Sequence, residues 1–235
     1  MTETPADRPS LWMKLTRYNF VKRKLSTRNL ERLCREFASD KRTLVVHSED
    51  VDYQPYFPNA FTVTKRKSKP ADMHVDLHYH DLSKIESESF EVVLCTGLLE
   101  HVPDPKRLID DIHRLLKPGG QLIISASAVF SFHEAPNDFF HFTPFSFRLL
   151  FDDWSEIKML RGASQPFETL AILTQRILRQ CRLFPFVRPL IELSYYITPV
   201  FDKLIITQYS IVGTTSEEFE IDSMLPSNMQ AVVVK

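Results

Sequence analysis

Hydrophobic residues in the middle of the chain form two continuous runs with a one-sided stripe between them. The runs lie at 92–94 and 122–124, and the stripe extends over 105–116. Short continuous runs are typical of strands buried on both faces, and a stripe with a period near 3.6 residues indicates a helix lying on a sheet. The pattern predicts a βαβ unit with parallel strands over 90–127.

The two ends of this predicted helix carry residues typical of helix boundaries. Asp104 stands at the N-cap position, and Pro105 follows at the first helical position, where its missing N–H has no cost. Gly119 and Gly120 follow the last apolar residue of the stripe and end the helix. The boundary residues therefore support the same assignment as the hydrophobic pattern.

Shorter patterns on both sides extend the alternation of strands and helices. Apolar runs predict further strands at 44–46, 61–63, 73–75, 154–160 and 231–234. Amphipathic stripes predict helices over 11–20 and 27–37, with Ser26 or Thr27 as the cap of the second, and Thr143 with Pro144 opens another helix. The chain is therefore expected to be an α/β protein.

Residues 165–210 differ from this pattern and predict a helical insertion packed over the edge of the sheet. One helical side is expected to be apolar (Leu170, Leu173, Ile177, Cys181) and another basic (Arg176, Arg179, Arg182). Three interpretations stay open for the insertion. It is a lid or homo-oligomer interface, a peripheral membrane contact through 170–190, or a site for an anionic or lipid-linked acceptor.

Composition bounds the class of protein. The 235 residues, 43% hydrophobic and 25% charged, are expected to form an N-terminal helical segment over 1–40 and one domain over 41–235. The net charge of −1 gives no reason to expect nucleic acid as a partner. No signal peptide or membrane-spanning run is predicted. Three widely spaced cysteines argue against disulfides or a zinc site and favour a reducing cytoplasm (Cys34, Cys95, Cys181).

The turn after the first strand has no glycine. Doubly wound nucleotide-binding folds usually place a glycine-rich turn there, so that the backbone can approach the ligand. Here the segment 47–52 contains none, and the first glycine of the chain is Gly97. Any cofactor bound at this end of the sheet therefore meets an altered loop.

The central block resembles the class I S-adenosylmethionine-dependent methyltransferases of the type 11 group. The residues that carry the resemblance are Phe90-Glu91-Val92-Val93, Leu99-Glu100-His101-Val102 with Asp104-Pro105, and Leu116-Lys117-Pro118-Gly119-Gly120. Weaker similarity extends it to about 43–160. The resemblance implies a Rossmann-like, doubly wound, seven-stranded sheet, mostly parallel with a final antiparallel strand.

The resemblance also implies positions for S-adenosylmethionine. The turn after the first strand would face its methionine part (Val46, His47, Asp50), Asp76 and Leu77 would lie by the adenine, and Thr96, Gly97 and Leu99 would line the floor by the sulfonium. The acid that usually holds the ribose is replaced at the end of the second strand (Thr64, Lys65, Arg66). Glu49, Asp50 or Asp52 is a candidate substitute carboxylate.

The loop after the fifth strand carries the candidate catalytic residues. His133 and His141 are expected on the acceptor side, where a histidine serves as base if the acceptor is a hydroxyl. Glu100 and His101 are interpreted as capping or bracing the following helix. The phenylalanines of 130–147 are expected to form core or an apolar pocket wall. The histidine spacing is not a zinc-protease signature, and no metal site is predicted.

Two functions therefore lead. One is a methyltransferase acting on a small molecule or a glycan or lipid precursor. The other is a non-catalytic relative that keeps the fold as a binding or partner subunit. The missing glycines favour the second, and the intact central block favours the first. A different reaction in the same pocket is a third hypothesis.

Overall fold

The computed structural model describes residues 24–46, 51–64, 67–75, 81–208 and 222–235. Its centre is a seven-stranded sheet in the order β3-β2-β1-β4-β5-β7-β6. The strands are β1 Thr43–Val46, β2 Ala60–Thr64, β3 Met73–His74, β4 Phe90–Thr96, β5 Leu116–Ser127, β6 Glu156–Gly162 and β7 Asn228–Val234. Only β7 runs antiparallel to its neighbours. The predicted fold class is confirmed.

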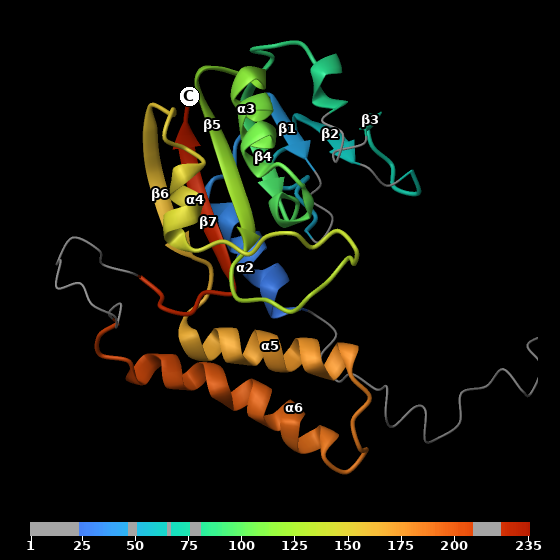
Figure 1. Cartoon of the computed structure of the whole chain (residues 1–235), viewed down its shortest axis with the longest axis vertical. Coiled ribbons are helices and arrows are strands. Elements are labelled where there is room, and N and C mark those ends of the chain that lie inside the picture. The colour runs from blue at the N-terminus through green and yellow to red at the C-terminus, as the bar shows by residue number, and fades with distance from the viewer. Residues whose placement is uncertain (1–23, 47–50, 65–66, 76–80, 209–221) are drawn as a thin grey trace, which may run out of the picture.

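Helices lie on both faces of this sheet and beyond one of its ends (Figure 1). The α-helices are α2 Leu25–Glu36, α3 Pro105–Leu115, α4 Pro144–Leu149, α5 Pro166–Gln180 and α6 Arg188–Ile197. The described residues also include three 3₁₀ segments: η2 Asp81–Lys84, η3 Leu99–His101 and η4 Thr198–Leu204. The helix predicted over 11–20 lies outside the described residues.

Two hydrophobic clusters divide the core between the faces of the sheet. Successive strand residues alternate between the clusters, so Leu44 packs with α3 on one face and Val45 packs with α2 on the other. α3 contributes the apolar stripe that its sequence predicts, including Ile109 and Ile112, which are fully buried. Continuous apolar runs therefore mark the central strands because both of their faces are covered.

The starts of α3 and α2 differ in how their first backbone N–H groups are satisfied. Asp104 caps α3 as predicted, and its carboxylate accepts a hydrogen bond from the backbone N–H of Arg107 at 3.1 Å. The prediction that Ser26 or Thr27 caps the earlier helix is wrong, because α2 already begins at Leu25. The backbone N–H of Leu25 instead donates to Oε1 of Gln175 on α5, so a tertiary contact replaces the local cap.

The strand predicted from residue 154 begins at Glu156 instead. Trp154 belongs to the turn after α4, where its ring packs edge-on against Phe151 and His113. The apolar character of Trp154 therefore comes from a core contact of the turn and not from a strand.

The insertion covers the carboxyl ends of the strands and not the sheet edge, which corrects the prediction. β6 runs parallel to β5, since both are antiparallel to β7, and it therefore ends at the carboxyl end of the sheet. The chain leaves the sheet there and re-enters at the same end to start β7. α5 and α6 lie side by side below the ends of β4 and β5 (Figure 1).

The apolar side that the sequence marks on α5 is not the buried side of the helix. Leu170 and Ile177 are 43% and 48% exposed, whereas the buried side consists of Thr169, Ala171, Ile172, Gln175 and Leu178. Two of these buried side chains are polar and have dedicated partners. Thr169 bonds Ser164, and Gln175 accepts from Leu25. A purely hydrophobic pattern therefore selects the wrong face. Among the described helices, none is long and apolar enough to cross a membrane.

Burial of the thiols gives a direct test of this fold. Burial raises the pKa of Cys34 to about 12 and raises the pKa of Cys95 further still, whereas Cys181 is exposed after α5. An aromatic disulfide reagent at pH 8 should therefore label one thiol per folded molecule and three in guanidinium chloride. The Cys181→Ser variant should label none while folded. Rapid labelling of two thiols in the native protein would contradict the described core.

Candidate active site at the carboxyl ends of β4 and β5

A cavity of about 370 Å³ opens where β4 and β5 end, under α5. The sheet contributes its floor, the 130–134 loop one wall, and α2 and α5 the rest. Its lining consists of Lys24, Ser26, Leu30, Lys69, Thr96, Gly97, Glu100, His101, Ser125, Ser127, Phe130, His133, Glu134, Arg176 and Asn228. The site therefore lies at the end of the sheet where parallel α/β proteins bind their ligands.

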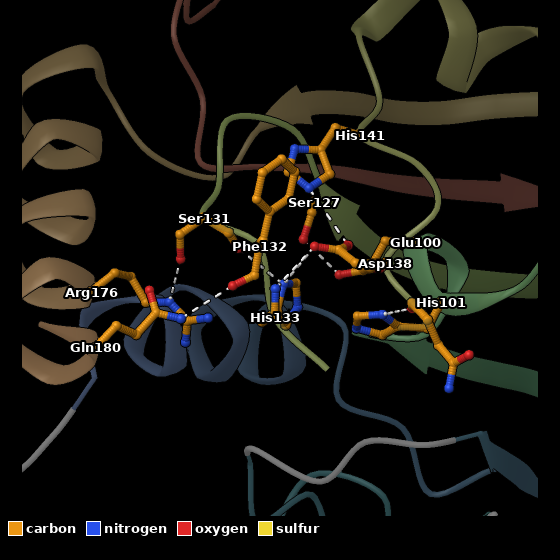
Figure 2. A network of polar contacts seen from close by, with 11 residues as sticks. Glu100, His101, Ser127, Ser131, Phe132, His133, Asp138, His141, Arg176 and Gln180 are labelled. Atoms are coloured by element: carbon orange, nitrogen blue, oxygen red, sulfur yellow. Dashed lines mark hydrogen bonds and ion pairs between the residues drawn. The ribbon is translucent and has the colours of Figure 1, made fainter. Parts of the chain in front are cut away.

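Glu100 lies at the centre of the polar contacts in the cavity (Figure 2). The hydroxyl of Ser127 on β5 donates a hydrogen bond of 2.7 Å to Oε1 of Glu100. The backbone oxygen of Glu100 accepts from the N–H groups of Phe139 and Phe140. The residue is 1% exposed, and Oε2 has no hydrogen-bond partner among the described residues. Glu100 does not cap the following helix, as the sequence had suggested, because Asp104 does so.

His101 is equally buried and has one ring nitrogen fixed. Its Nδ1 lies 2.6 Å from the backbone oxygen of Asn137. A carbonyl oxygen can only accept, so Nδ1 carries the hydrogen and Nε2 keeps its lone pair. His101 therefore enters the site with its ring held in one orientation by this hydrogen bond.

His133 lies against His101 from the opposite loop. The two ring centroids are 4.6 Å apart in an edge-to-face arrangement. Nδ1 of His133 lies 3.1 Å from the backbone oxygen of Ser131, and its backbone N–H donates to the carboxylate of Asp138. Burial, and after it the neighbouring His101, lower the pKa of His133. His133 is therefore neutral at pH 7, with Nε2 as the free acceptor.

His141 does not line the cavity. Its Nε2 lies 3.6 Å from Oδ1 of Asp138, whose other carboxylate oxygen lies 3.5 Å from Nδ1 of His133. Asp138 is the buried link between the two histidines that the sequence singles out, and the sequence analysis did not select it (Figure 2).

Basic and aromatic side chains form the wall toward the insertion. Nε of Arg176 donates to Ser131 at 2.9 Å, and its guanidinium lies 4.5 Å from the centre of the Phe130 ring. Gln180 donates to the backbone oxygen of Phe132. α5 therefore holds the loop that carries His133.

The phenylalanines predicted as core or pocket wall divide between three environments. Phe142 and Phe147 are buried in the core, and Phe130 lines the cavity. Phe132 is 84% exposed, and Phe139, Phe140 and Phe145 are also exposed.

The predicted cofactor contacts also fall into groups. Thr96 and Gly97 line the cavity, and Gly97 has a φ of +63°, a conformation that favours glycine. Val46 and Leu99 are fully buried in the core cluster around α3. His47, Asp50, Asp76 and Leu77 lie outside the described residues.

A second cavity of about 230 Å³ borders the carboxyl end of β2, where the ribose-binding acid was expected. Asp52 and Thr64 line it together with Lys69, which also borders the first cavity. Asp52 is thus the substitute carboxylate that the structure places next to a cavity. Glu49, Asp50, Lys65 and Arg66 lie outside the described residues.

Comparisons with known proteins agree with this geometry. Residues 25–124 match the model of a methyltransferase domain, type 11. A ubiquinone biosynthesis O-methyltransferase of Pseudomonas syringae pv. tomato is 51% identical over 45 residues, which are 19% of this chain and 19% of that protein. The match therefore covers about a fifth of the curated relative.

Solved structures extend the likeness over most of the chain. A SAM dependent methyltransferase from Archaeoglobus fulgidus superposes with a TM-score of 0.53 at 13% identity, covering 90% of this chain and 93% of that one. A Haemonchus contortus phosphoethanolamine N-methyltransferase, in complex with phosphomonomethylethanolamine and S-adenosylhomocysteine, has a TM-score of 0.50 at 13% identity over 88% of this chain and 52% of that one.

Strand order, site position and family model all define the same class of protein, a class I S-adenosylmethionine-dependent methyltransferase fold. The match to the type 11 model over residues 25–124 confirms the resemblance carried by the central block. Sequence reasoning missed Ser127, which lines the cavity, and Asp138, which contacts His133 behind it. The sequence signal for Ser127 was that Ser125 and Ser127 interrupt the apolar run at the end of β5. Polar side chains at a buried strand end need hydrogen-bond partners.

The bond from Ser127 to Glu100 can be tested against a matched control on the same strand. Ser127→Ala removes the one hydrogen bond that the Glu100 carboxylate accepts from the described residues and should lower the free energy of unfolding by about 1.5–3 kcal/mol. Ser125→Ala should change it little, because the Ser125 hydroxyl is buried without a partner among the described residues. Urea denaturation measures both, and equal losses would contradict the described network.

Proposed function

We propose that this protein transfers the methyl group of S-adenosylmethionine to an oxygen of an acceptor that enters the cavity from the side of the insertion. The observation that carries the proposal is a single cavity that Thr96 and Gly97 line together with two histidines, His101 and His133. The family match and the likeness to a complex with S-adenosylhomocysteine support it.

The described residues fit such a cofactor at two places. Gly97 leaves open space, since a Cβ built there would meet nothing within 4 Å, and the group can lie close to the backbone. Asp52 borders the second cavity, where a carboxylate can accept from ribose hydroxyls. The cofactor supplies an electrophilic methyl group on a positively charged sulfur.

His133 is the candidate base for the acceptor. Its Nδ1–H is directed at the backbone oxygen of Ser131, and Nε2 is left to accept a proton. The lowered pKa of His133 keeps its imidazole neutral at pH 7. As pH falls below the ordinary value of about 6.5, the unfolded chain binds this proton more readily than the folded protein, so the folded state loses stability. We assign His141 a positioning role through Asp138, which contacts both histidines.

A lipid-linked acceptor is favoured by the outer face of the insertion. Many large apolar side chains there are exposed: Phe184, Phe186, Leu190, Leu193, Tyr196, Ile197, Val200, Phe201, Leu204 and Ile206. Arg176, on the inner side of α5, lines the cavity. An acceptor drawn from a lipid surface at this face would therefore reach the site along α5.

The exposed charges of the insertion have the sign that an anionic membrane attracts. The exposed charged residues described between 166 and 208 are all basic: Arg179, Arg182 and Lys203. Of the three acids in this segment, Glu168 is partly exposed in the first turn of α5, and the other two are used internally. Glu192 pairs with Arg188 in a buried ion pair, and Asp202 accepts from two N–H groups at the start of α5. A second copy of this chain would meet the same basic residues, which disfavours a dimer through this face.

Calorimetric titration with S-adenosylmethionine and S-adenosylhomocysteine tests the reaction class. Both should bind, and Asp52→Asn should weaken binding about tenfold or more if its carboxylate holds the ribose. Asp153→Asn, a change at an exposed carboxylate near α3, is the control and should leave the affinity unchanged. No heat and no thermal shift at millimolar ligand would favour the non-catalytic alternative.

Sedimentation with vesicles tests the lipid-facing surface. The protein should bind vesicles that contain phosphatidylglycerol, less so pure phosphatidylcholine, and added salt should weaken the binding. Leu190→Glu on α6 should abolish it, whereas Leu149→Glu, an equally exposed leucine on α4, should not. Light scattering completes the test. Two results together would show that this face binds a second copy instead of a membrane. The parent protein would bind no vesicles, and it would form a dimer that Leu190→Glu dissociates.

A further inference from the structure

Three potential metal ligands converge on the floor and wall of the cavity. A carboxylate oxygen of Glu100 and one ring nitrogen each of His101 and His133 all lie within 4.8 Å of one another. We propose that these three residues bind a divalent transition metal ion at the acceptor end of the site. The sequence predicts no such site, because its ligands come from two segments that only the fold brings together.

Glu100 supplies the strongest indication. Its Oε1 is bonded to Ser127, but Oε2 has no partner among the described residues, although the residue is almost completely buried. A buried carboxylate oxygen without a donor costs folding free energy, typically about 1–3 kcal/mol or more for a charged group. A cation at Oε2 would remove that cost. The bond from Ser127 would then orient the ligand.

Both histidines have the arrangement typical of metal ligands. Nδ1 of His101 donates to Asn137, and Nδ1 of His133 donates to Ser131, each to a backbone oxygen. Such bonds fix the ring and the tautomer and leave Nε2 to bind the ion.

The spacing agrees with a site that contracts on binding. Ligand atoms about 2.1 Å from an ion in tetrahedral geometry lie about 3.4 Å apart. The limit of 4.8 Å therefore requires each pair to approach by up to about 1.4 Å, which side-chain rotation supplies. Glu100 and His101 are adjacent in η3, while His133 approaches from the loop after β5.

The donor set selects the kind of ion. Two imidazoles and one carboxylate suit Zn²⁺, Co²⁺, Fe²⁺ or Mn²⁺ better than Mg²⁺ or Ca²⁺, which prefer oxygen ligands. Three protein ligands leave at least one position open, as in catalytic and not structural sites. The open position would face the cavity, where the acceptor is expected.

This inference rests on the proposed function and sharpens it. A cation there would bind an acceptor hydroxyl and lower its pKa, so that its proton leaves to water before or during transfer. The new O–C bond then forms as the S–C bond breaks, and the electron pair of that bond stays on sulfur, which becomes neutral. With the ion bound, Nε2 of His133 is a ligand, and the base role described above applies to the ion-free protein.

Titration of the full chain with Co²⁺ alone, without methyl donor, tests the site by visible absorption. A saturable band of four- or five-coordinate cobalt is expected at one ion per chain. Glu100→Gln, His101→Asn and His133→Asn should each weaken binding by at least about tenfold. His113→Asn is the matched control and should leave the affinity unchanged, since His113 does not belong to the three.

Imidazole NMR signals of the parent protein provide a second measurement that does not depend on the variants folding. Co²⁺ should broaden the signals of His101 and His133 well before that of His113, which packs on Trp154. Absence of a saturable band, or equal loss in the His113→Asn variant, would overturn the proposal. Metal binding without any binding of S-adenosylmethionine would instead retain the site and refute the methyltransferase function.

Discussion

The hydrogen bond from Ser127 to the Glu100 carboxylate connects the ends of the two central strands, and the rest of the site depends on it. Glu100 in turn accepts from the backbone of the loop that carries Asp138 and His133. Glu100 thus joins β5 through its carboxylate and the loop through its backbone oxygen. Such a group is stable inside a protein only when its partners are in place. This requirement explains why a polar network occupies the most buried end of the sheet.

Strand direction determines where the insertion can act. Since β6 ends at the carboxyl end of the sheet, α5 and α6 lie over the site and not beside it. α5 then has two sides with different roles. One side holds the 131–133 segment through Arg176 and Gln180, and another packs against α6, which carries exposed apolar side chains. A single helix therefore links the cavity to the surface proposed for the acceptor.

The sheet was predictable from the sequence because its central strands are covered on both faces and read as uninterrupted apolar runs. The Asp104 cap was predictable because it is local. The start of α2, the inner face of α5 and the position of the insertion were not, since each depends on contacts between distant segments such as Leu25 with Gln175. For the same reason, Glu100 was taken for a helix brace. Its partners, Ser127 and the 139–140 backbone, become neighbours only in the fold.

Backbone NMR with S-adenosylhomocysteine tests the central claim, that this fold still binds the methyl donor at the end of β4. The chain has only five glycines, so their amide signals can be assigned readily. The account predicts the largest shift at Gly97, on the cavity floor, and little change at Gly119 and Gly120, which lie at the other end of β5. Unchanged Gly97 and Thr96 signals at millimolar ligand would contradict it.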